Sequence, residues 1–166
     1  MILVNIAAAL ILFLSFIGGI MQGAAKSFFS LISLIIAIPI AGIFYPFLAR
    51  LFHFLPGENW QNFIGFLVAL AVASIILSFI FFLPRKITEK TWPNGILLRL
   101  IGGILNLLVA GIGLAMLTYL ISAYPVWDWL EQAVVNSSIM DWLVSTLGFV
   151  QELLPEAIRN FRQPLA

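Results

Sequence analysis

Side chains able to do chemistry are scarce in this chain. It has one histidine, His53, and no cysteine. A single histidine without cysteine cannot supply the ligands of a zinc site. A Ser–His nucleophile pair would need an elbow of the Gly-x-Ser-x-Gly type, which is absent, as are the phosphate-loop, dinucleotide and zincin motifs. We therefore predict no catalytic residue, no cofactor and no metal ion, and we do not expect an enzyme.

Neutral polar side chains within apolar stretches are the next candidates. Asn5, Gln22 and Asn106 each lie inside or at the end of such a stretch. These groups could form hydrogen bonds between membrane helices or line a polar path for a solute. No Asp, Glu, Lys or His lies deep in the stretches, and a proton-coupled carrier would need ionisable groups there. The hydrogen-bonding and solute-path interpretations both stay open.

The stretches that position these residues are long enough to cross a membrane. Hydrophobic residues make up 63% of the chain and charged residues 9%, with a net charge of +1. That composition excludes a soluble globular domain, which carries about 25% charged residues, and it offers no basic footprint for nucleic acid. A spanning helix needs about 20 apolar residues. The pattern predicts an all-α polytopic membrane protein with four transmembrane helices at residues 2–22, 28–48, 62–83 and 99–121.

The distribution of lysine and arginine predicts how the chain is oriented. The loops after the first and third helices carry five basic residues, whereas the other side has only Arg50 close to the membrane. Because cytoplasmic loops carry the excess of Lys and Arg, we expect both termini to be extracytoplasmic. The predicted cytoplasmic basic residues are Lys26, Arg85, Lys86, Lys90 and Arg99.

Small residues recur on one face of each predicted span. Gly19 and Gly23 form a Gly-xxx-Gly pair, and the fourth span has a similar face. Such faces let helix backbones approach closely in lipid. We expect a compact four-helix bundle, or four helices shared with a partner chain. The predicted packing and polar-interior residues are Asn5, Gly19, Gly23, Gly102, Asn106, Ala110 and Gly113.

Residues 124–166 differ in character from the transmembrane domain at 1–123 and are predicted to form an extracytoplasmic amphipathic tail. We expect a short helix at about 125–135 and a longer one at about 138–154, with Ser138 as the N-cap of a capping box. The apolar stripe of the longer helix either covers the bundle as a lid at the membrane surface or docks a partner protein. The predicted interface residues are Ser138, Asp141, Trp142, Leu143, Leu147, Val150 and Leu154.

These features, in this order, resemble the colicin V production (CvpA) family of small bacterial inner-membrane proteins. The resemblance covers roughly residues 1 to 155. It includes an Arg-x-x-Gly sequence at the start of the last span and a Leu-Leu-Pro sequence near residue 155. Members usually carry charged residues where this chain has Asn5, Gln22 and Ser27. The residues that carry the resemblance are Asn5, Gly23, Lys26, Arg99, Gly102, Ser137, Ser138, Leu153, Leu154 and Pro155.

The resemblance implies a four-span protein of the bacterial cytoplasmic membrane that is needed for colicin V production or export and is linked to envelope robustness. We expect a non-enzymatic accessory protein that supports toxin production or secretion, or envelope homeostasis. Its partners would be the lipid bilayer and other membrane or periplasmic proteins, or a second copy of the chain. One alternative is an oligomeric channel or carrier for a small solute, and another is a structural subunit of a larger membrane complex.

Overall fold

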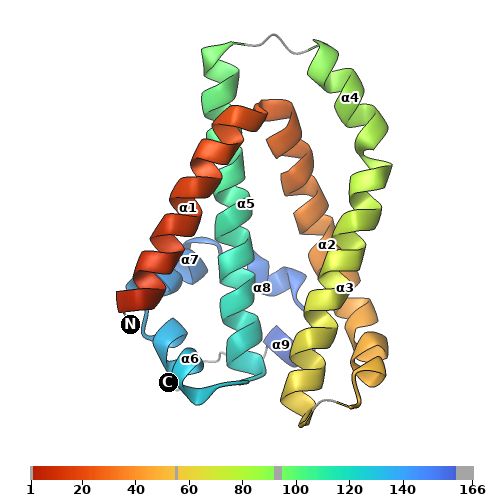
Figure 1. The fold of residues 1–166 in the computed structure, drawn as a ribbon, viewed down its shortest axis with the longest axis vertical. Coiled ribbons are helices and arrows are strands. Elements are labelled where there is room, and N and C mark those ends of the chain that lie inside the picture. Colours follow the sequence, from red (N-terminus) through yellow and green to blue (C-terminus); the bar gives the residue numbers. More distant parts are fainter. Residues whose placement is uncertain (1, 55, 92–94, 160–166) are drawn as a thin grey trace.

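The computed structural model describes residues 2–54, 56–91 and 95–159, and all the regular secondary structure in them is helical (Figure 1). Four helices are long and apolar enough to cross a membrane, which confirms the predicted fold class. Short helices follow them. The bounds are α1 Ile2–Gln22, α2 Ala24–Leu51, α3 Glu58–Ile80, α4 Phe82–Thr91, α5 Ile96–Ala123, α6 Asp128–Val135, α7 Ser138–Thr146, α8 Phe149–Leu153 and α9 Glu156–Arg159.

The candidate spans overlap the predicted ones, and their ends differ for local reasons. α2 begins at Ala24 rather than at residue 28, because Gly23 alone reverses the chain with a φ of 82°. Only glycine adopts this left-handed backbone without strain. The third span was predicted to reach residue 83, but α3 ends at Ile80 and a bend leads into α4. Pro84 lies in the first turn of α4, where its missing N–H is tolerated.

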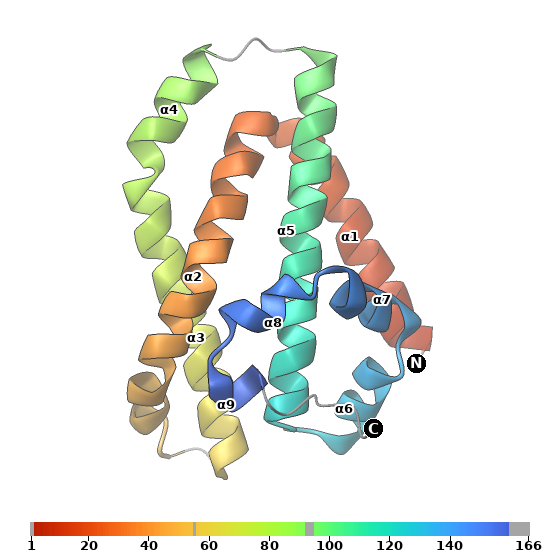
Figure 2. The same cartoon turned by 180° about the vertical axis from the view of Figure 1, so that it is seen from behind.

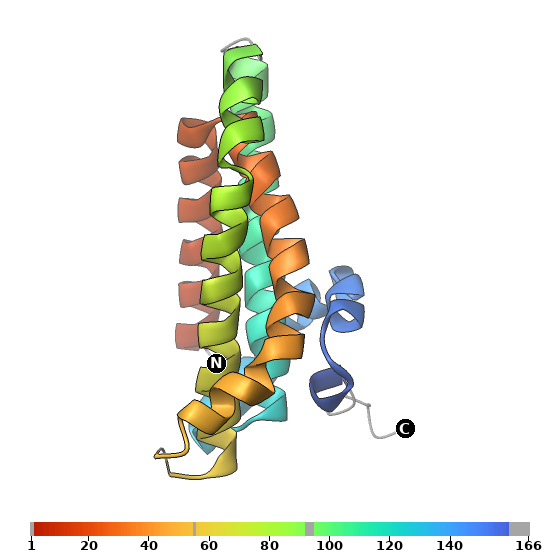
Figure 3. The ribbon, with the colours of Figure 1, turned by 90° about the vertical axis from the view of Figure 1, so that its right-hand side faces the viewer.

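The long helices form an open row in the order α1, α5, α2, α3 (Figures 1 and 2). α5 packs against α1 and α2, and α2 packs against α3. α1 and α3 therefore lie at the two ends of the row, an arrangement more open than the compact four-helix bundle that was one expectation. The helices α7 to α9 lie on one side of the row, against α5, where a closing helix would otherwise pack (Figure 3).

The tail helices do not form the single helix expected at 138–154. The chain breaks at Leu147 and Gly148, between α7 and α8. The break allows the apolar stripe to follow the surface of α5 and then reach α2, with Leu143, Leu147 and Val150 all buried. A straight helix would carry the later residues away from that surface.

The tail also lies at an unexpected depth. A Cβ placed on Gly111, halfway along α5, would lie 3.2 and 3.3 Å from methyl carbons of Leu147 and Leu143. A Cβ on Gly42 of α2 would lie 2.9 Å from Pro155. α7 to α9 thus pack along the sides of the candidate spans, whereas α6 lies at the end of the row (Figure 2).

The buried core centres on the second half of α5, where Ile112, Ala115 and Leu120 are almost fully enclosed. At the end of α5, the hydroxyl groups of Tyr45 and Tyr124 are hydrogen-bonded at 3.2 Å. Burial raises the pKa of the Tyr124 phenol, and the hydrogen bond to Tyr45 raises it further. Both observations indicate that this phenol stays neutral at physiological pH.

Candidate functional site

The closest contact between spans is the crossing of α1 and α5, which Gly19 and Gly102 form. A Cβ on Gly102 would lie 2.6 Å from the Gly19 carbonyl oxygen and 2.9 Å from the backbone nitrogen of Ala24. A Cβ on Gly19 would in turn collide with the Gly102 carbonyl oxygen. The two backbones are therefore in direct contact, and any side chain at either position would force the helices apart.

Gly23 contributes to this crossing through its backbone. A Cβ on Gly23 would have open space around it, so side-chain volume does not explain the glycine. Its positive φ does, because the resulting turn brings the Gly23 carbonyl carbon to 2.6 Å from a Cβ placed on Gly102. The predicted Gly19/Gly23 pair thus acts as one contact residue and one turn residue.

Asn106 joins α5 to α1 next to this crossing. Its Nδ2 donates to the Ser15 carbonyl oxygen at 2.6 Å. The predicted neighbours on the same helix behave differently, since Ala110 is half-buried and Gly113 has open space where a Cβ would be. The expected small-residue face of the fourth span is therefore used in its first half, and its assignment to packing is wrong at Gly113.

Asn5 anchors the tail to the start of α1. The Ser137 hydroxyl donates to Asn5 Oδ1 at 2.5 Å, and the Ile139 backbone N–H reaches the same oxygen at 3.4 Å. Asn106 bonds to α1 itself, and Gln22 is exposed at the far end of α1. Asn5 thus lies apart from the other two polar residues considered for a solute path, whereas a Cβ on Gly18 would lie 3.7 Å from Asn106 Nδ2 and 3.9 Å from Gln22 Nε2.

The N-cap of α7 is Ser137, and the prediction of Ser138 is wrong by one residue. The Ser137 hydroxyl oxygen accepts from the Met140 backbone N–H at 3.3 Å, whereas Ser138 is exposed as the first residue of the helix. Both serines fit the sequence pattern of a cap. The hydrogen bond to Asn5, which comes from a distant part of the chain, distinguishes them.

The predicted tail interface divides into a buried and an exposed set. Leu143, Leu147, Val150 and Leu154 are buried against the long helices. Asp141 and Trp142 are on the other face of α7, and 60% of the Trp142 side chain is exposed. Among the described residues, the tail therefore covers its own helices with one set of side chains and leaves Trp142, a large aromatic residue, mostly exposed.

The predicted basic residues gather at one end of the row, which we call the basic end. It comprises the turn at Gly23, α4 and the start of α5 (Figure 1). The Lys86 ammonium lies 5.0 Å above the Phe82 ring, and the Arg99 side chain is exposed. Lys26 and Arg85 are half-buried and line a common cavity. The residues of the basic end are Lys26, Arg85, Lys86, Lys90 and Arg99.

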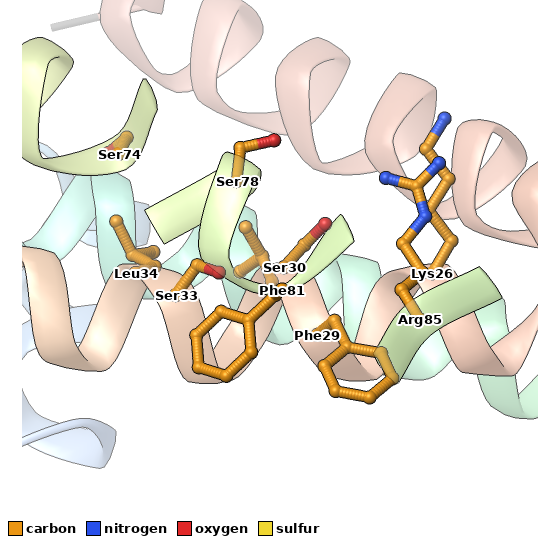
Figure 4. A pocket seen from close by; sticks show the side chains of 10 residues that line it. Lys26, Phe29, Ser30, Ser33, Leu34, Ser74, Ser78, Phe81 and Arg85 are labelled. Carbon is orange, nitrogen blue, oxygen red and sulfur yellow. The ribbon is translucent and has the colours of Figure 1, made fainter. Parts of the chain in front are cut away.

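The cavity at the basic end was not predicted from the sequence. It has a volume of about 280 Å³ and lies between α2 and α3, with Arg85 from α4 and one wall residue from α5 (Figure 4). The signal that could have revealed it is the recurrence of serines on the facing helices, at i and i+3 on α2 and at i and i+4 on α3. The lining residues are Lys26, Phe29, Ser30, Ser33, Leu34, Ser74, Ser78, Phe81, Arg85 and Val109.

His53 lies at the other end of the row. It is exposed and lines an open pocket of about 410 Å³ together with Arg50 and Glu58. Within residues 2–54, 56–91 and 95–159, no group of three or more His, Cys, Asp or Glu side chains could hold a metal ion. The arrangement around His53 therefore does not provide a metal-binding set in the described chain.

A comparison with known protein families gives a match that covers most of the chain. The family model described as colicin V production protein matches residues 4–148, which cover the four candidate membrane helices, apart from the first two residues of α1, and continue through α6 and α7. The curated proteins and the solved structures compared with the chain gave no match. The family is not known for enzymes. The match covers far more than half of the sequence, so this chain belongs to the colicin V production protein family.

Proposed function

We propose that this membrane protein is a non-enzymatic accessory protein that supports colicin V production or secretion, or envelope homeostasis, by assembling with other membrane proteins. Membership of the colicin V production family supports the biological setting. The open row of spans is the observation that carries the assembly role. Its end helices, α1 and α3, each have one long helix as their main packing partner.

Several large apolar side chains on the end helices have no cover within the described chain. The exposed fraction is 62% for Phe13 on α1 and 78% for Phe79 on α3. Lipid satisfies such faces, and so does another apolar helix. An exposed tail face that includes Trp142 adds a surface outside the row. These surfaces are where the proposed partners would bind.

The proposed orientation places the basic end in the cytoplasm and both termini outside. All five residues of the basic end lie at one end of the row, as the positive-inside rule requires of a cytoplasmic side. The described ends of the chain, Ile2 and Arg159, both lie toward the opposite end (Figure 1). An alkaline phosphatase fused after Ala166 should be active, because that enzyme needs the extracytoplasmic side. An inactive phosphatase together with a fluorescent cytoplasmic reporter at the same position would reverse the orientation.

Complementation tests the proposed role directly. The chain should restore colicin V secretion or envelope resistance to a bacterial strain that lacks its own family member. A photocrosslinking residue at Phe13 or Trp142 should then capture a membrane or periplasmic protein, whereas the same residue at buried Ala115 should not. Full complementation with crosslinks only to lipid at both exposed positions would reject the assembly role.

A solute carrier remains the competing function to test, although the hydrogen bonds of Asn5 and Asn106 do not favour it. Purified protein in liposomes should show no solute-specific flux. Flux that Asn106→Leu removes would support a carrier and contradict the accessory role.

A further inference from the structure

The cavity between α2 and α3 has two cationic side chains at its mouth. Lys26 projects from the first turn of α2, and Arg85 projects from α4 toward the same end of the cavity (Figure 4). The described residues that line it include no acidic side chain. Two cationic side chains that converge on one half-buried space are able to donate charge-assisted hydrogen bonds to a bound anion.

Serine hydroxyls line the cavity below the two cations. Ser30 and Ser33 come from α2, and Ser74 and Ser78 come from α3. Some helical hydroxyls of this chain bond to their own helix, as Thr118 does to the Leu114 carbonyl at 2.9 Å, whereas the buried hydroxyls of Ser27 and Ser122 have no partner among the described residues. Among the described residues, no such bond is found for the four serines of the cavity. Their hydroxyl groups are therefore able to donate to a ligand.

The walls of the cavity are built from apolar side chains. The rings of Phe29 and Phe81 pack at 5.7 Å between centroids, and Leu34 and Val109 line the cavity from α2 and α5. Ser33 is seven residues beyond Lys26, about 10 Å along the helix axis. The cavity thus runs from a cationic mouth to a hydroxyl-lined interior within apolar walls.

We propose that this cavity binds a phosphate-bearing anion. The Arg85 guanidinium and the Lys26 ammonium would hold the phosphate oxygens through charge-assisted hydrogen bonds. The serine hydroxyls would donate to further oxygens of the ligand. The phosphate belongs either to an anionic phospholipid of the leaflet at the basic end or to a soluble phosphate. This site goes beyond the proposed accessory role and does not depend on it, since it uses no residue of the tail.

Binding to the purified full-length protein tests the proposal, with two ligand arms. In the lipid arm, native mass spectrometry compares phosphatidylglycerol with phosphatidylcholine. In the soluble arm, inorganic phosphate is compared with chloride for protection against thermal unfolding in an uncharged detergent. Specific binding in the lipid arm identifies a lipid phosphate, and protection in the soluble arm identifies a free phosphate. Absence of both overturns the proposal.

Three variants separate the cavity from the general charge of the basic end. Lys26→Gln and Arg85→Gln should each weaken binding about tenfold or more, as expected for losing a hydrogen bond to a charged group. Lys86→Gln removes the same charge next to Arg85, but Lys86 lies over Phe82 and does not line the cavity. It should weaken binding less than about threefold. An equal loss in all three variants would show surface attraction only and would overturn the site.

A double variant, Ser33→Ala with Ser74→Ala, keeps the proposal testable if a charge variant does not fold. It retains both cations and removes hydroxyl groups from the interior, so binding should fall several-fold, about as for neutral hydrogen bonds. Ser145→Ala, at an exposed position of α7, is the matched control and should bind as the unmodified protein does. Unchanged binding in the double variant would show that the serine hydroxyls do not contact the ligand, and it would contradict the proposed site.

Discussion

The α1–α5 and α2–α3 interfaces use similar residues and reach different results. At the α1–α5 crossing, the Gly19 and Gly102 backbones touch, and Asn106 adds a hydrogen bond to α1. The α2–α3 interface is also close near Gly65, where a Cβ would lie 2.8 Å from the Ala49 backbone nitrogen. Toward the basic end, however, α2 and α3 separate around the serine-lined cavity.

The difference shows that small residues allow close packing without enforcing it. Glycine removes the Cβ and lets backbones touch, so that dispersion and Cα–H contacts hold the helices together. Serine is nearly as small, but its hydroxyl needs a partner when it is buried. A pair of serine faces therefore either bonds across the interface or leaves room for a polar group. At the basic end of α2 and α3, the structure has the second arrangement.

The largest effect is expected at the α1–α5 crossing. Gly102→Ala should destabilise the protein by about 2–3 kcal/mol, because the new methyl group collides with two backbones that have little room to move. Gly113→Ala is the matched control, since its Cβ enters open space. It should stabilise the helix by about 0.5–1 kcal/mol. Reversible unfolding in detergent measures the change in the free energy of unfolding for both variants. A change of the same sign in both would contradict the assignment of backbone contact to Gly102 and open space to Gly113.

The close part of the α2–α3 interface should respond in the same direction with a smaller change. Gly65→Ala should cost about 1–2 kcal/mol, because the collision is with the Ala49 backbone and is less severe than at Gly102. Unfolding in detergent again measures it. An unchanged free energy of unfolding would mean that α2 and α3 can move apart at Gly65 at little cost. The interface near Gly65 would then not be more tightly packed than the interface around the cavity.

Asn106→Leu sharpens the comparison by removing only the hydrogen bond of the α1–α5 interface. Loss of the bond to the Ser15 carbonyl should cost about 0.6 kcal/mol and at most about 1.7 kcal/mol, the range found for hydrogen bonds between membrane helices. The change should be measured in the same unfolding experiment as Gly102→Ala. A larger loss than that of Gly102→Ala would show that the hydrogen bond, and not backbone contact, dominates this interface.

The smallest effect is expected in the cavity. Ser33→Ala with Ser74→Ala should change the free energy of unfolding by less than about 0.5 kcal/mol, because neither hydroxyl is bonded within the described protein. Unfolding without added phosphate or anionic lipid is the appropriate measurement. A loss comparable to that of Gly65→Ala would indicate that the serines hold α2 and α3 together, and the two interfaces would then be alike.

The sequence by itself determined the class of this protein and the rough position of its spans. Apolar stretches longer than the hydrocarbon core, with charges only between them, leave a chain no arrangement except helices in a membrane. The gathering of Lys26 and Arg85 at one end also follows, because consecutive spans alternate in direction. The capping signal near residue 138 was readable to within one residue.

Tertiary structure decided which face of each helix is used and how the row is ordered. Every span has a face of small residues, so the sequence does not tell whether Gly102 or Gly113 meets a neighbour. The bond between Asn5 and Ser137 joins residues 132 positions apart, and no local pattern encodes such a pairing. The cavity has the same origin. Lining residues from separate helices come together only when those helices pack, since shape complementarity is a property of pairs of surfaces and hydropathy is a property of each segment alone.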